Sequence, residues 1–266
     1  MTTHGPTAGG GTGAAAATPD WERVRADFPL LQRQVHGKPL VYLDSANTAQ
    51  KPRAVIEAVD DFYRRHNANV SRAVHQLGSE ATEAYEGARR KLAAFLNVRA
   101  DELVLCSGTT FALNLVAYSW ALPRLKAGDA ILLTRMEHHA NIVPWQLVAQ
   151  RTGATLRVAE LRPDGSLDLE ALWAAMTPEV KLLGLAHVSN VLGTVNPVAE
   201  ICRQARARGI TTVIDGSQAV PHMPVDVAAL GCDFYAFTGH KLCGPTGTGG
   251  LWARRAHLEA MPPFLG

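Results

Sequence analysis

The chain has 266 residues, of which 47% are hydrophobic and 19% are charged, and this composition excludes a chain that is disordered throughout. Its 26 basic and 24 acidic side chains leave a formal net charge of +2, so no strong field points to nucleic acid or to an anionic membrane as a partner. Its four scattered cysteines form no C-x-x-C pair and no cluster with histidine, which argues against a disulfide framework and against a metal site of the structural zinc type.

Composition divides the chain into three regions. Residues 1–18 are rich in Gly, Ala and Thr and carry no large apolar side chain after Met1, so we expect a disordered tail there. An N-terminal segment at 19–45 and a folded domain at 46–266 follow. Neither a secretory signal nor an apolar run long enough to cross a membrane is present, which predicts a cytoplasmic location.

Two amphipathic helices are predicted first, over 53–65 and 80–96. In the second, Tyr85, Ala88, Leu92 and Phe95 recur at spacings of three and four, which predicts one buried stripe.

From Asp101 onward, short apolar runs alternate with helical patterns. The predicted strands are 103–106, 130–133, 155–158, 181–186 and 211–214. The predicted helices between them are 141–151, 167–176 and 197–208, with Gly153 and Gly209 as caps. This order predicts an α/β fold in which helices cover both faces of a mostly parallel sheet. Ligands bind such sheets beyond the carboxyl ends of the strands, so we expect the functional residues directly after each strand.

Lys241 is the lysine whose surroundings stand out among only six lysines. It follows an aromatic run at 234–237 and precedes a glycine-rich stretch at 244–250 that lets backbone approach a ligand closely. A partly desolvated lysine has a lowered pKa and can act as a Schiff-base nucleophile. The alternative is that Lys241 is a surface residue whose aliphatic chain packs on the protein while its ammonium group stays in water.

Asp215 ends an apolar strand, so its carboxylate needs a compensating cation or donor. A helix-capping role is possible. Taken with Lys241, however, it fits pyridoxal phosphate chemistry, in which a lysine holds the aldehyde carbon and a carboxylate holds the ring nitrogen.

The sequence Ser107-Gly108-Thr109-Thr110 supplies three hydroxyls and a glycine where a strand gives way to a helix. Such a helix start can cradle a phosphate, although Ser and Thr cap many helices without any ligand. Thr238 and His240 can add donors to the same phosphate.

Further polar side chains follow the other strands. His138 can stack on a planar ring and move protons near neutral pH. The alternatives are ordinary hydrogen bonding within a loop and metal ligation together with His139. A metal site is disfavoured because no third ligand is near in the sequence. Asn190 and Gln218 can hydrogen-bond a ring's phenolic oxygen or satisfy only backbone.

Five blocks of sequence carry a family resemblance. They are 42–46, 137–145, 187–193, 215–218 and 238–241. Together they resemble the group II (SUF-type) cysteine desulfurases, which belong to the class V aminotransferase family and have the large domain of fold type I pyridoxal phosphate enzymes. The likeness runs in order from about Trp21 to Gly266.

The resemblance implies a role for each matching residue. Lys241 matches the Schiff-base lysine, Asp215 the partner of the pyridinium nitrogen, and His138 the imidazole that stacks on the ring and transfers protons. Gln218 and Asn190 match residues that contact the cofactor's oxygen or the substrate. The matching phosphate ligands are Thr109, Thr110, Thr238 and His240.

The implied activity is the removal of sulfur from L-cysteine, which gives L-alanine and an enzyme persulfide for iron–sulfur cluster assembly. The resemblance also implies a homodimer and a protein that accepts the sulfur. Selenocysteine lyase, with L-selenocysteine as substrate, or another class V reaction is the alternative. From a different class, a cofactor-free remnant can serve as an interaction module.

The chain departs from the family in two ways. Ser71 stands where many members have a histidine. Members also continue past 262–266 into a C-terminal region with the sulfur-accepting cysteine, an arginine for the substrate carboxylate and much of the small domain. We therefore expect a chain without that small domain, able to bind cofactor without turning over cysteine. The cysteines that remain do not convincingly replace the nucleophile; they are Cys106, Cys202, Cys232 and Cys243.

Overall fold

The computed structural model describes residues 19–71 and 74–265. The expected tail at 1–18, residues 72–73 and Gly266 lie outside the described residues. Within them, a seven-stranded sheet has the order β3-β9-β8-β7-β6-β4-β5. The strands are β3 (Leu103–Cys106), β4 (Ala130–Thr134), β5 (Thr155–Ala159), β6 (Val180–Ala186), β7 (Thr211–Asp215), β8 (Phe234–Thr238) and β9 (Gly249–Ala253).

The sheet is parallel from β5 through β4, β6 and β7 to β8, while β9 pairs antiparallel with both β8 and β3. A small hairpin of β1 (Gln34–Val35) and β2 (Lys38–Pro39) lies outside this sheet. The predicted α/β class and the mostly parallel sheet are confirmed, as are the five predicted strands to within one residue at each end. β8 and β9 are not among the predicted strands. In the sequence, 234–237 stands out only as an aromatic run, and the glycines of β9 are typical of a loop.

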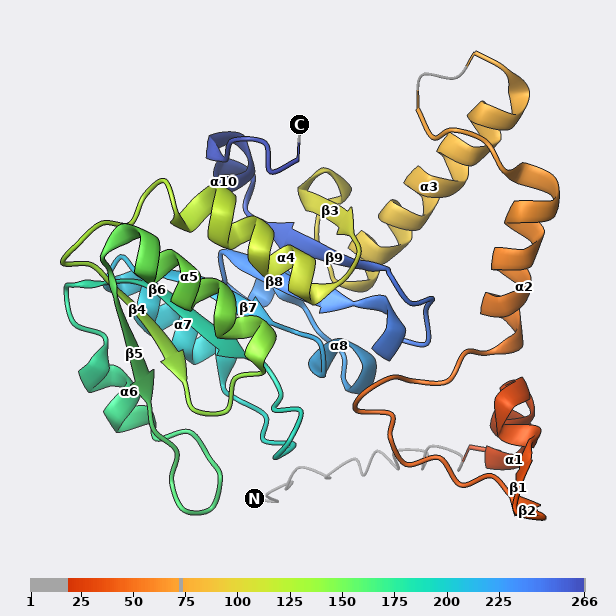
Figure 1. Ribbon diagram of the computed structural model, residues 1–266, viewed down its shortest axis with the longest axis horizontal. Helices are drawn as coiled ribbons and strands as arrows, with labels where there is room; N and C mark the ends of the chain where they lie inside the picture. Colours follow the sequence, from red (N-terminus) through yellow and green to blue (C-terminus); the bar gives the residue numbers. More distant parts are fainter. Residues whose placement is uncertain (1–18, 72–73, 266) are drawn as a thin grey trace, which may run out of the picture.

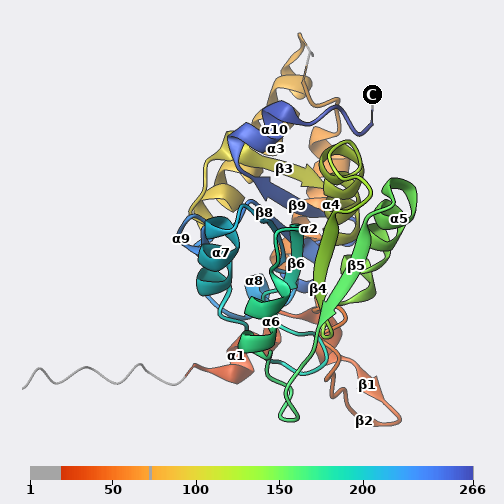
Figure 2. The same cartoon turned by 90° about the vertical axis from the view of Figure 1, so that its left-hand side faces the viewer.

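Helices cover both faces of the sheet (Figures 1 and 2). The larger helices are α2 (Arg53–Asp61), α3 (Gln76–Phe95), α4 (Thr109–Val116), α5 (Val143–Thr152), α6 (Leu169–Ala175) and α7 (Val198–Ala207). The shorter ones are α1 (Trp21–Ala26), α8 (Ala219–His222), α9 (Val227–Leu230) and α10 (Arg255–Ala260).

Successive residues of β4 point to opposite faces of the sheet and pack into two separate hydrophobic cores. Ile131 and Leu133 of β4 pack with α4 and α5 on one face, while Leu132 packs with α6 and α7 on the other. Because side chains alternate along a strand, a strand buried on both faces is apolar throughout. This is why β4 and β6 read as continuous apolar runs.

The helix boundaries follow local chemistry. α3 begins at Gln76, four residues before the prediction, because the His75 ring accepts a hydrogen bond from Gly78 N at 3.2 Å and caps the helix. Gly153 is the C-terminal cap of α5, as predicted, and its φ of 75° lies in the left-handed region that favours glycine. The helix predicted over 53–65 is α-helical to Asp61 and continues as a π-helical turn, Phe62–His66.

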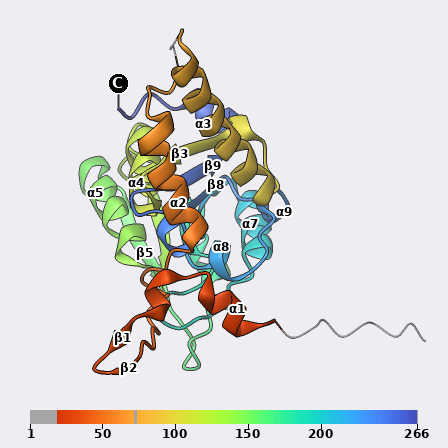
Figure 3. The same cartoon turned by 90° about the vertical axis from the view of Figure 1, so that its right-hand side faces the viewer.

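The predicted buried stripe on α3 is wrong. Tyr85 is 37% exposed and Phe95 is 55% exposed, whereas the fully buried residues of the helix are Gly78, Ala81 and Ala93. α2 and α3 stand at one side of the sheet (Figures 1 and 3). Within the described chain, Tyr85, Ala88 and Leu92 line an open apolar groove. Of the predicted stripe, Leu92 is the member that also packs against the core. The rest is uncovered because a helical period reports an apolar face and not what covers it.

Candidate active site

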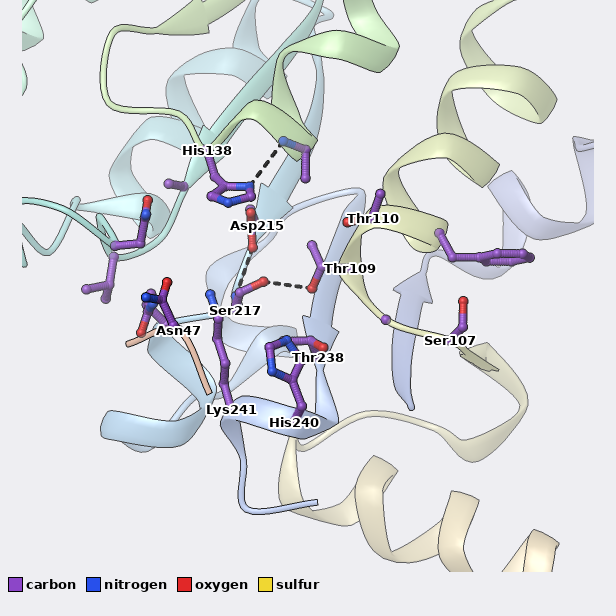
Figure 4. Close-up of a pocket in the computed structure, with 17 residues that line it drawn as sticks. Asn47, Ser107, Thr109, Thr110, His138, Asp215, Ser217, Thr238, His240 and Lys241 are labelled. Atoms are coloured by element: carbon purple, nitrogen blue, oxygen red, sulfur yellow. Dashed lines mark hydrogen bonds between the residues drawn. The ribbon is translucent and has the colours of Figure 1, made fainter. Parts of the chain in front are cut away.

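One pocket gathers the predicted site residues (Figure 4). It lies where β6, β7 and β8 end and α4 begins. All nine predicted residues line it: Thr109, Thr110, His138, Asn190, Asp215, Gln218, Thr238, His240 and Lys241. The sequence blocks are up to 132 residues apart, between Thr109 and Lys241, and the parallel sheet brings them together because its strands share one carboxyl edge.

Lys241 closes a short 3-10 turn, Gly239–Lys241, directly after β8. Its side chain is half-buried and extends toward Asp215 and Ser217 (Figure 4). Burial lowers the pKa of the Lys241 amine, and the Asp215 carboxylate partly opposes that shift. A lowered pKa increases the fraction of unprotonated, nucleophilic amine.

Asp215 is the last residue of β7 and is 6% exposed. Its Oδ1 accepts a hydrogen bond from Ser217 N at 2.9 Å, which fixes the carboxylate at the sheet edge. A buried carboxylate held this way is available to a cationic ligand atom in the pocket.

His138 lies beyond β4, and its ring stands over the Asp215 side of the pocket (Figure 4). The Nδ1 atom accepts a hydrogen bond from Ala140 N at 3.1 Å, so the neutral ring carries its proton on Nε2. Burial lowers the pKa of His138, with further lowering from His139 and Lys241 and an opposing effect of Asp215. The His139 ring packs beside it, with centroids 4.0 Å apart.

The start of α4 forms a cradle of donors. Gly108 has a φ of 138°, and a Cβ there would lie 3.1 Å from Thr238 Oγ1. Gly249 of β9 is equally constrained, because its Cβ would lie 2.5 Å from Gly108 Cα. These two glycines let β9 and Thr238 approach the start of α4 closely. The hydroxyl side chains of Thr109 and Thr238 line the pocket there, and a helix start with such donors is an arrangement that binds anions.

Asn190 and Gln218 both line the pocket. Gln218 Nε2 donates to the backbone oxygen of Ala46 at 2.7 Å, so in this structure the amide holds an N-terminal segment against the site. Ser71 is not among the pocket-lining residues; its backbone N–H donates to Thr82 Oγ1 at 2.9 Å.

Three contributors lie outside the predicted set. Asn47 lines the pocket from the N-terminal segment, and Ser217 lines it from the loop after β7. Ser217 Oγ lies 2.7 Å from Thr109 Oγ1 in a buried contact. Glu137 is buried next to the pocket-lining His138 and accepts from Ala186 N at 3.0 Å and Asn141 Nδ2 at 2.7 Å. Glu137 and Ser217 belong to the sequence blocks quoted above, but no local pattern distinguishes their roles.

The cysteines lie elsewhere. None of the pocket-lining residues in the described part of the chain is a cysteine. Burial raises the pKa of the Cys106 thiol and raises that of Cys202 to about 12, so both are poor nucleophiles.

The described residues, 19–71 and 74–265, contain no group of three His, Cys, Asp or Glu side chains that could hold a metal ion. No helix in the same ranges has both the length and the apolar character needed to span a bilayer.

The chain is similar in sequence and in fold to several known proteins. A probable cysteine desulfurase of Xylella fastidiosa (strain 9a5c) is 73% identical over 256 residues, which are 96% of this chain and 62% of that protein. The crystal structure of the Escherichia coli cysteine desulfurase CsdA superposes with a TM-score of 0.84 at 42% identity, covering 94% of this chain and 61% of CsdA. A C-DES mutant with glycine covalently linked to its PLP cofactor is 27% identical, with a TM-score of 0.81 over 94% of this chain and 63% of that one.

The chain thus spans about 62% of the length of the curated relatives it matches. Its match to the aminotransferase class-V family extends over residues 41–266 and includes every residue of the pocket described above. The chain belongs to the aminotransferase class-V family.

Proposed function

We propose that this chain is the pyridoxal phosphate-binding part of a cysteine desulfurase of the group II (SUF) type. The observation that carries the proposal is the placement of Lys241 and Asp215 in one pocket, with the amine extending toward the carboxylate (Figure 4). Relatives named cysteine desulfurase, and a related structure with a PLP cofactor, support this choice within the family. The substrate proposed is L-cysteine and the products are L-alanine and a persulfide.

The residues present fit the cofactor. The half-buried amine of Lys241 suits the aldehyde carbon, the buried Asp215 carboxylate suits a protonated ring nitrogen, and the glycine-framed cradle of α4 suits a phosphate. Asn190 and Gln218 can contact the phenolic oxygen. The residues that would hold the phosphate are Thr109, Thr110, Thr238 and His240.

The bound cofactor supplies an electron sink that weakens bonds at the substrate's α-carbon. The protein's own residues supply the rest. Lys241 provides an amine that is unprotonated more often than an exposed lysine, and it can accept a proton at Nζ. His138 holds a proton at Nε2 because its Nδ1 accepts from Ala140 N, and a neutral imidazole of this kind can donate that proton.

The remaining parts of the proposal rest on the family. They are a homodimer, a separate sulfur-accepting protein, a role in iron–sulfur cluster assembly and a cytoplasmic location. We also propose that residues 46–266 form the cofactor-binding domain and 19–45 an N-terminal segment. Because no cysteine lines the described pocket, the sulfur-accepting thiol is proposed to come from outside its lining residues.

The test is covalent trapping of the cofactor. Purified protein incubated with pyridoxal phosphate should develop an absorbance band, and borohydride reduction should leave the cofactor's mass on the peptide that contains Lys241. Lys241→Ala should abolish both signals, while Lys126→Ala, at an exposed lysine, should keep them. Protein that traps no cofactor on Lys241 contradicts the proposal and favours a non-catalytic module.

Substrate choice needs a separate measurement. Alanine release from L-cysteine and from L-selenocysteine by the cofactor-loaded protein, with a small thiol added as the sulfur acceptor, distinguishes a desulfurase from a selenocysteine lyase. Release from L-selenocysteine alone would replace the proposed substrate without removing the cofactor assignment.

A further inference from the structure

Residues 44–51, here called the N-terminal strap, form one wall of the pocket through Asn47. The strap contacts the rest of the site through hydrogen bonds at two points. Gln218 Nε2 donates to Ala46 O at 2.7 Å, and the backbone oxygen of His240 accepts hydrogen bonds from the strap. Figure 4 shows Asn47 of the strap close to the end of the Lys241 side chain.

Three donors of the strap converge on the His240 oxygen. Ala49 N lies at 3.0 Å, Thr48 Oγ1 at 3.2 Å and Lys51 Nζ at 2.8 Å from it. His240 immediately precedes Lys241 within the same 3-10 turn. A carbonyl that accepts three hydrogen bonds is strongly fixed, so these contacts fix the turn that carries the reactive amine.

Lys51 is the charged member of this group. Its ammonium bridges two backbone oxygens, that of His240 and that of Ala49 at 2.6 Å, and so joins the turn to the strap. Hydrogen bonds from an ionised donor are stronger than neutral ones. The charge also reaches the site, because burial, Lys241 and Lys51 all lower the pKa of His240.

Burial lowers the pKa of Lys51 itself, although the electrostatic effect of Cys243 opposes the shift. The groups that face the ammonium are therefore the His240 and Ala49 carbonyls, the His240 ring and the Cys243 thiol. The Lys51 side chain is therefore held against the turn by its two hydrogen bonds and does not extend freely into water.

We propose that Lys51 is a positioning residue for Lys241: it holds the His240 carbonyl and thereby fixes the turn that presents the Lys241 amine to the pocket. The importance of that amine rests on the proposed function, but its position and environment can be measured without cofactor.

The experiment is competitive labelling of Lys241 with acetic anhydride in the cofactor-free chain, followed over pH by peptide mass spectrometry. In Lys51→Met the turn loosens and Lys241 becomes better hydrated. The midpoint of its labelling profile should move to higher pH, with at least about a threefold smaller unprotonated fraction at pH 7. Lys51→Arg, which keeps a charged donor, should restore most of the original profile.

Lys91→Met is the matched control, since Lys91 is exposed on α3 and its removal should leave the profile unchanged. A folded Lys51→Met protein with the wild-type Lys241 profile overturns the proposal. Should Lys51→Met fail to fold, Lys51→Ala, which also removes the donor, is measured in the same way, and a shifted or an unshifted Lys241 profile then supports or overturns the proposal.

Loading with pyridoxal phosphate adds an independent readout. The rate at which borohydride-stable cofactor accumulates on Lys241 should fall in Lys51→Met by a factor similar to the loss of unprotonated amine, with urea unfolding showing that the protein stays folded. If the wild-type chain takes up no cofactor, the proposed function fails while the labelling result still decides the role of Lys51.

Discussion

Asn141 and Glu137 share a buried hydrogen bond of 2.7 Å, and the other end of the Asn141 amide accepts from Trp145 Nε1 at 2.8 Å. The Glu137 carboxyl also accepts from Ala186 N, at the end of β6, at 3.0 Å. Glu137 thus connects the loop that carries His138 to the end of the neighbouring strand β6, where Ala186 lines the pocket. A substitution at Glu137 would therefore disturb the hydrogen-bond partner of both Asn141 Nδ2 and Ala186 N.

Glu137→Gln should change how stability depends on pH. Burial raises the pKa of Glu137 to about 7 from the ordinary 4.5, against opposing hydrogen bonds from Thr134, Ala186 and Asn141 and with a small further rise from Asp215. Because the folded protein holds this proton more tightly than the unfolded chain, wild-type stability declines as pH rises from about 4.5 through 7. The decline relative to the variant should approach about 3 kcal/mol.

Urea unfolding of both proteins at pH 5 and pH 8 measures that difference. Glu57→Gln, on an exposed part of α2, is the control for removing one carboxyl group. A wild-type-to-variant difference in unfolding free energy that is equal at the two pH values would show that Glu137 does not titrate in this range.

Ser217→Ala should weaken both the fold and the cradle. The variant leaves the buried Thr109 hydroxyl without the partner that now lies 2.7 Å away, which should cost about 1–2 kcal/mol of unfolding free energy. Because Thr109 is a proposed phosphate ligand, the dissociation constant of pyridoxal phosphate should also rise. Equilibrium unfolding and a cofactor titration give the two values.

The control for this variant is Ser79→Ala, whose hydroxyl is exposed and makes one long contact of 3.4 Å with His75 O. It should change neither value measurably. Unchanged cofactor affinity in a destabilised Ser217→Ala protein would confine the role of Ser217 to stability.

Gly249→Ala should displace β9 from the cradle. Its Cβ would lie 2.5 Å from both Gly108 Cα and Phe237 O, which are backbone atoms that cannot rotate away. Overpacking of this kind should lower stability by about 1–3 kcal/mol. Thermal unfolding measures the loss, and the amide NMR signal of Thr109 should shift because Gly108 must move.

Gly87→Ala is the matched control, because the space around Gly87 can accept a Cβ. A Cβ on Gly87 of α3 would have Arg90 Nη2 as its nearest neighbour, at 3.8 Å, so Gly87→Ala should stabilise the protein by about 0.5–1 kcal/mol through helix propensity. Equal effects of the two glycine substitutions would refute the close approach of β9 to Gly108.

The sequence by itself determined the parts of this protein that depend on local patterns. Apolar runs in β4 and β7, with polar residues directly after them, located the strands and predicted that His138 and Asp215 lie at one sheet edge. This worked because parallel strands with covering helices bring their carboxyl ends together, so order along the chain translates into proximity.

Only the tertiary structure decided the contacts that cross the chain. The insertion of β9 between β3 and β8, the exposure of Tyr85 and the hydrogen bond from Lys51 to His240 O each depend on segments far apart in sequence. Residues 51 and 240 are 189 positions apart in the sequence. Periodicity reports which face of an element is apolar, but pairing between distant segments depends on the packing of the whole sheet.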